Sequence, residues 1–121
     1  MTDTKDYVSK LREIVRTDPR YDIESYFFVQ NALSFCVSKL EKKRHITGRE
    51  LLDSIRQYTI QEYGPLGREV LEHWGVYRCE DFGEIVFNMV EDGLLRKSET
   101  DSKKDFENNF DFADAFNEDV Y

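Results

Sequence analysis

The chain contains few of the residues that most often carry chemistry in small proteins. Its 121 residues include only two cysteines and two histidines. Cys36 and Cys79 lie far apart, and neither His45 nor His73 stands at zinc-ligand spacing from another ligand type. We therefore expect no metal, no cofactor and no catalytic residue. The two thiols are interpreted as one core thiol, Cys36, and one loop thiol, Cys79.

Long apolar runs are also missing. The chain shows no stretch that could span a membrane, and its first 15 residues lack the basic cap and apolar block of a signal peptide. These features predict a cytoplasmic protein with reduced thiols and no membrane partner. Seven tyrosines and nine phenylalanines supply enough apolar surface for one folded domain with one core.

Basic residues are the minority, with a formal net charge of -8 for the whole chain. The exception is the segment 39–49, here called the basic patch, whose net charge is +4. Its cations are Lys39, Lys42, Lys43, Arg44 and Arg49. They are either a solvated helix end or a dock for an anion. The anion would be a nucleic-acid phosphate, an acidic partner or the chain's own acidic tail.

Apolar spacing predicts two helices in the first third of the chain. The first carries Tyr7, Leu11 and Ile14 on one face and ends before Asp18 and Pro19. A second, long helix begins after Asp22 as N-cap. Three phenylalanines widen its apolar face, so this helix is either central to the fold or half of a subunit interface. The candidate interface residues are Phe27, Phe28 and Phe35.

Three further helices follow in the middle of the chain. Thr47 and Glu50 have the spacing of a capping box, and Ile46 and Leu51 that of a hydrophobic staple, so a third helix begins here. Gly64 and Pro65 separate it from a fourth helix that ends at Gly75. The fifth helix spans residues 80–92, which hold five acids and no Lys or Arg, so this helix is not expected to read DNA.

The C-terminal third predicts a small β-hairpin. Residues 94–98 and 103–108 are the expected strands, joined by a polar turn, and a short helix is expected near Ala113. The predicted fold is therefore mainly α, with about five helices and a hairpin in the order of a winged-helix domain. We expect a single helical domain over 1–109, made of a helical pair (1–45) and a winged-helix-like unit (46–109). An acidic aromatic tail follows at 110–121.

Motifs that suggest catalysis have simpler interpretations. Asp81-Phe82-Gly83 matches the metal-binding triplet of protein kinases, but the rest of the kinase signature is missing. We interpret Phe82 as core and Gly83 as a site of close helix packing. His45 is interpreted as part of a solvated basic helix end. His73 is interpreted as a partner for the carbonyl groups at the end of the fourth helix. The enzymatic alternatives that the sequence leaves open are a Cys79–His pair and an acidic cleft.

Several motifs resemble those of a small family of uncharacterised proteins from planctomycete and verrucomicrobial bacteria. They are GRELL, YGPL, WGV, EDFGEIVF and DFENNFDF, in this order within residues 26–116. The resemblance implies a short cytoplasmic bacterial protein and supplies no activity, cofactor or site residue. With no catalytic grouping, we expect a non-enzymatic interaction module or adaptor that binds a protein partner or forms a homodimer. The alternative is a nucleic-acid-associated regulator that binds through the basic patch.

Overall fold

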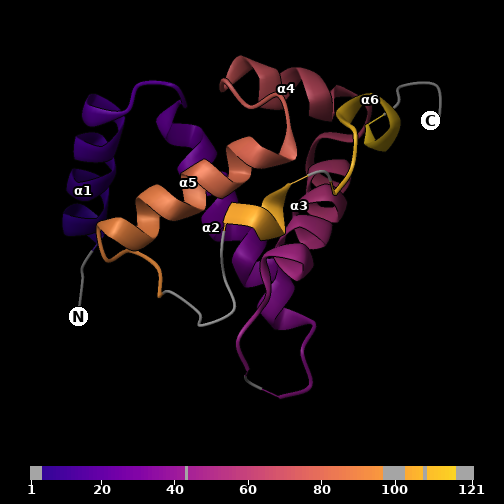
Figure 1. Cartoon of the computed structure of the whole chain (residues 1–121), viewed down its shortest axis with the longest axis horizontal. Coiled ribbons are helices and arrows are strands. Elements are labelled where there is room, and N and C mark those ends of the chain that lie inside the picture. Colours follow the sequence, from indigo (N-terminus) through magenta and orange to yellow (C-terminus); the bar gives the residue numbers. More distant parts are fainter. Residues whose placement is uncertain (1–3, 43, 97–102, 108, 117–121) are drawn as a thin grey trace.

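The computed structural model describes residues 4–42, 44–96, 103–107 and 109–116. These residues form α-helices and two short 3-10 helices, labelled η, and within the described ranges there is no strand (Figure 1). In chain order the elements are α1 (Thr4–Thr17), α2 (Ile23–Ser38), α3 (Gly48–Tyr63), η1 (Gly64–Leu66), α4 (Gly67–His73), α5 (Cys79–Glu91), η2 (Lys103–Phe106) and α6 (Phe112–Ala115). The mainly α prediction is confirmed.

The turn between α1 and α2 forms where the sequence predicts it. α1 ends just before Asp18 and Pro19, and Asp22 is the N-cap of α2. Its carboxylate accepts a hydrogen bond from the Glu24 amide at 2.9 Å, so one of the open amides of the first turn is satisfied.

A polar network ties this turn to α5. The Arg20 guanidinium bridges the carboxylates of Asp18 (2.7 Å) and Glu84 (3.2 Å). The Asn88 side-chain amide donates to Asp18 at 2.9 Å and to the Tyr26 hydroxyl at 3.1 Å. The hydrogen bond from Arg20 holds the pKa of the Asp18 carboxyl well below its usual range, because it favours the charged form.

The start of α3 carries the predicted capping box. The Thr47 hydroxyl accepts from the Glu50 amide at 3.1 Å, and the Glu50 carboxylate accepts from the Thr47 amide at 3.0 Å. At the far end of α4, Gly75 has a φ of +89°, and a Cβ there would lie 2.2 Å from the Arg20 carbonyl oxygen. Only glycine fits this turn, because both its backbone angle and its packing exclude a side chain.

α2 lies at the centre of the fold. In Figure 1 α5 crosses in front of α2, with α1 on one side and α3 on the other, and α2 contacts all three. Tyr26, Val29 and Ala32 on α2 are fully buried, as are Leu52 and Ile55 on α3. The apolar width of α2 is therefore explained by neighbours within the chain on several sides.

The predicted β-hairpin is wrong for the described residues. α5 ends in a Schellman motif, in which the Gly93 amide donates to the Val90 carbonyl and the Leu94 amide to the Met89 carbonyl. The chain after α5 thus bonds back to the helix instead of pairing as a strand. Lys103–Phe106, expected as the returning strand, form η2. The predicted turn, residues 98–102, lies outside the described residues.

The winged-helix assignment fails together with the hairpin, because the described residues contain no β wing. The physical reason lies in Phe106, which is 3% exposed and is buried between α3 and α5. A Cβ on Gly48 would lie 3.0 Å from the Phe106 ring, and one on Gly83 would lie 2.9 Å from its Cβ. Burial of one aromatic side chain between two glycines decided the local structure, in a segment with little β-branched content.

The acidic aromatic tail continues this packing. Phe112 and Phe116 are buried, and the predicted short helix near Ala113 is confirmed as α6. Phe112 packs against Phe82 of α5, with ring centroids 6.1 Å apart. In Figure 1 α6 lies at the opposite end of α3 from the basic patch, so the described part of the tail, residues 110–116, does not dock there.

Candidate functional site

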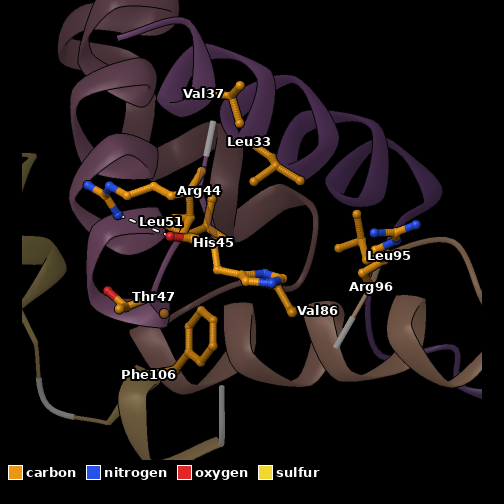
Figure 2. Close-up of a pocket in the computed structure, with 12 residues that line it drawn as sticks. Leu33, Val37, Arg44, His45, Thr47, Leu51, Val86, Leu95, Arg96 and Phe106 are labelled. Carbon is orange, nitrogen blue, oxygen red and sulfur yellow. Dashed lines mark hydrogen bonds between the residues drawn. The ribbon is translucent and has the colours of Figure 1, made fainter. Parts of the chain in front are cut away.

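An apolar groove lies between α2, the start of α3, α5 and η2 (Figure 2). Its volume is about 190 Å³. The apolar residues that line it are Leu33, Val37, Ile46, Leu51, Val86, Leu95 and Phe106. Its polar residues are Arg44, His45, Thr47 and Arg96, and among the described residues no carboxylate belongs to the lining. This combination of an apolar floor and cations makes the groove the candidate site.

The floor of the groove is buried and its edge is open. Leu51 and Phe106 are 6% and 3% exposed, respectively, whereas Val37 on α2 is 42% exposed. Leu33 and Val86 are half-buried. Buried side chains fix the shape of the floor, and the exposed edge offers apolar surface that a bound group would remove from water.

The start of α3 positions one wall. Ile46 and Leu51, predicted as a hydrophobic staple, both line the groove. The capping box holds Thr47 between them, so the chain enters α3 at a fixed angle. The sequence signal for a helix start therefore also marks this wall.

Arg44 joins the capping box to the groove. Its guanidinium binds both Glu50 oxygens, at 2.9 and 2.6 Å, and donates to the His45 carbonyl oxygen at 3.0 Å. The hydrogen bond from Arg44 and that from the Thr47 amide lower the pKa of Glu50 to about 2. Arg44 is therefore held in place by a carboxylate that stays ionised at neutral pH.

The cations stand on opposite sides of the apolar floor. Figure 2 shows Arg44 on one side and Arg96 on the other, with the His45 ring over the space between them. Arg96 is exposed, and it forms no ion pair with any other described residue. The groove thus has positive charge at each end in a protein whose net charge is negative.

The structure divides the predicted basic patch. Lys39 lies over the Phe35 ring, with its Nζ 4.0 Å from the centroid, and donates a hydrogen bond to Gln57. This contact directs Lys39 toward α3, and Lys39 does not line the groove.

The other members of the patch are also dispersed. Lys42 and Arg49 are exposed and do not line the groove, and Lys43 lies outside the described residues. Among the patch residues that the structure describes, Arg44 alone also belongs to the groove. The groove takes its second arginine, Arg96, from the segment expected as a strand.

The three candidate interface phenylalanines are used within the chain to different degrees. Phe28 is 4% exposed and packs against Trp74, with ring centroids 5.4 Å apart. Phe27 and Phe35 are half-buried, against Tyr7 and Tyr58 respectively. Phe28 is therefore core, and the aromatic face of α2 is largely covered by the fold itself.

The candidate Cys–His chemistry finds no support in the geometry. Cys79 is the first residue of α5 and is 1% exposed, so its interpretation as a loop thiol is wrong. Its thiol donates to the Phe110 carbonyl oxygen at 3.4 Å, and burial raises its pKa. Cys36 is a core thiol, as predicted, and His45 and His73 are exposed.

The kinase-like triplet has a structural role. The Asp81 carboxylate accepts from the Tyr77 amide at 2.9 Å and from the Tyr21 hydroxyl at 2.7 Å, which links α5 to the α1–α2 turn. Burial and this hydrogen bond raise the pKa of Tyr21. Phe82 is fully buried and Gly83 faces Phe106, in agreement with the core and close-packing interpretation.

Two further searches of the described residues bear on function. No three His, Cys, Asp or Glu side chains gather there in a way that could hold a metal ion. No helix in the same residues has both the length and the apolar character needed to cross a membrane.

The chain matches no family model, and comparison with curated proteins and with solved structures gave no match. The resemblance to the planctomycete and verrucomicrobial family therefore stays a prediction. Function must be inferred from the groove itself.

Sequence reasoning missed Leu95, Arg96 and Phe106 as groove residues, because it placed all three in the hairpin. A signal for the correct local structure was present. Gly93 followed by Leu94 is the pattern of a Schellman motif, in which the apolar residue after the glycine returns to the helix.

Proposed function

We propose that this protein is a non-enzymatic interaction module that binds a segment of a protein partner in the groove. The observation that carries the proposal is the open apolar lining between two arginines, with Val37 at its exposed edge. Preformed apolar grooves with a few polar groups at their ends are typical of peptide recognition.

The size of the groove sets the kind of contact. A space of about 190 Å³ accommodates one or two apolar side chains and not a whole folded surface. Each such side chain contributes about 1.5–3 kcal/mol when it is fully buried. Two of them supply at most about 6 kcal/mol, and the loss of translational and rotational freedom costs about 4 kcal/mol or more, so apolar burial alone corresponds to a weak contact with a Kd in the millimolar range or higher. The expected partner is therefore a short segment that is bound and released rapidly.

The aromatic face of α2 contributes little to this proposal. Phe28 is buried against Trp74 within the chain, so a homodimer built on this residue would require the core to open. The contact surface that we propose lies at the other end of α2, where Leu33 and Val37 face the groove.

Affinity capture from native lysate after chemical cross-linking, followed by mass spectrometry, tests the proposal, because cross-linking retains a partner that is released rapidly. The matched baits are the wild-type chain, Val37→Ser in the groove and Leu66→Ser in η1. Leu66 is 55% exposed and does not line the groove, so both variants replace an exposed aliphatic side chain by serine. Circular dichroism verifies that all three baits are folded.

We expect a protein partner whose recovery is the same with wild type and Leu66→Ser and lower with Val37→Ser, with or without nuclease treatment. A capture profile that Val37→Ser leaves unchanged would overturn the proposal. Partners lost on nuclease treatment, together with salt-sensitive binding to nucleic acid through Lys42 and Arg49, would favour the nucleic-acid alternative instead.

A further inference from the structure

The charge distribution of the groove points to the chemistry of its occupant. We infer that the groove binds an acidic peptide in which carboxylates flank an apolar side chain, an inference that rests on the proposed function. Arg44 and Arg96 stand at its two ends, and no carboxylate of the described residues lines it. A segment with one acid on each side of an apolar residue matches this order of charge, apolar surface and charge.

The two arginines contribute unequally. Arg44 already binds the Glu50 carboxylate through both of its terminal nitrogens, at 2.9 and 2.6 Å, so its charge is partly neutralised before any ligand arrives. Arg96 is exposed and has no ion-pair partner among the described residues. Arg96 is therefore the main determinant of the preference for acids, and Arg44 orients a second carboxylate with its remaining N–H groups.

The chain itself supplies an example of the proposed pattern beside the groove. Asp105-Phe106-Glu107 is an acidic residue, an aromatic residue and another acidic residue in succession, and its Phe106 is buried against Gly48 and Gly83. The same Phe106 forms one wall of the groove. The surface between α3 and α5 thus already holds an acid–aromatic–acid segment, and the open groove continues that surface.

Binding of three fluorescein-labelled peptides to the full chain, followed by fluorescence anisotropy, tests the inference. The acidic probe is GEDFEDG, the basic counterpart is GKKFKKG, and the acidic peptide without an apolar centre is GEDSEDG. We expect the acidic phenylalanine peptide to bind at least about tenfold more tightly than either control, and to weaken as salt is raised from low to high concentration.

Matched variants assign the binding to the groove. Arg96→Glu is expected to weaken the acidic probe about fivefold, the size of an exposed charge pair, whereas Arg12→Glu on the exposed face of α1 leaves it unchanged. Val37→Ser is expected to weaken the acidic probe about threefold, and Leu66→Ser to leave it unchanged.

Three results would overturn the inference and leave the proposed function standing. The first is binding of the basic peptide as tight as that of the acidic one, with both sensitive to Val37→Ser. The second is binding of the acidic peptide that neither Arg96→Glu nor Val37→Ser affects. The third is no binding of any probe while affinity capture still finds a partner that depends on Val37. If Val37→Ser captures the partner as well as wild type does, that result would instead contradict the proposed function.

Discussion

Truncation of Phe106 to alanine tests whether the C-terminal segment belongs to the core. The side chain is 3% exposed and is held between Gly48 and Gly83, so close to both that a Cβ on either glycine would crowd it. Replacing a buried phenylalanine by alanine usually costs about 3–5 kcal/mol. Because Phe106 also borders the groove, water can enter the vacated space, and we expect about 3 kcal/mol, the lower end of that range.

Urea denaturation followed by Trp74 fluorescence measures this loss. Trp74 is the only tryptophan, and its ring packs against Phe28 and Tyr63, so its emission reports the helical core and not the segment itself. With a denaturant slope of about 1.5 kcal/mol per M, a loss of 3 kcal/mol lowers the urea midpoint by about 2 M. Tyr77→Ala, at a side chain that is 62% exposed, is the matched control and should shift the midpoint little.

An unchanged Trp74 midpoint for Phe106→Ala would refute this reasoning. It would mean that η2 undocks without weakening the packing of α3 on α5, and that the helices fold independently of the residues that follow them.

Three further predictions concern the turns, the acid response and the buried thiol. Gly75→Ala should lower the free energy of unfolding by at least about 2 kcal/mol in urea titrations, because its Cβ would meet the Arg20 carbonyl oxygen. Gly93→Ala, which has a positive φ and open space around it, should cost about 1 kcal/mol. The stability that ionised Asp18 supplies is complete above its ordinary pKa of 3.8 and is lost as the pH falls, so melting curves of Asp18→Asn should depend less on pH below 4 than those of wild type. Cys79 should react with a thiol reagent only when the chain unfolds, since its thiol is buried.

Each of these predictions has a contrary result. Equal losses in the free energy of unfolding for Gly75→Ala and Gly93→Ala would show that the close approach of Gly75 to Arg20 adds nothing to the cost of a side chain there. If the melting temperatures of wild type and Asp18→Asn fall in parallel as the pH is lowered, Asp18 does not contribute to the loss of stability in acid. Rapid labelling of Cys79 under native conditions would show that the start of α5 opens readily.

Local signals were sufficient for the helices. Asp22 and Thr47 cap α2 and α3 because a short side chain with an oxygen satisfies the open amides at a helix start, whatever lies further away. Pro19 ends α1 for an equally local reason, its missing amide, and the positive φ of Gly75 is also a local signal, although its close packing against Arg20 is not. Helix positions up to residue 93 could therefore be predicted from neighbours in sequence.

The candidate site was only partly predictable. Arg44 was identified from the concentration of positive charge in the sequence, but its bidentate contact with Glu50 depends on how the chain enters α3. Arg96 and Phe106 could not be assigned correctly, because their roles depend on contacts with α2, α3 and α5. Residue spacing carries no information about such distant partners.

The sequence by itself determined the helices before residue 93, the caps of α2 and α3, the net negative charge and the apolar residues of the core, because these follow from residue spacing and composition. Only the tertiary structure decided the path of the chain after α5. The bond from the Leu94 amide to the Met89 carbonyl is local, whereas Phe106 enters the space left by Gly48 and Gly83, which are distant in sequence. The fit of one ring between two distant glycines outweighs a weak local preference for a strand, and that fit also forms one wall of the groove.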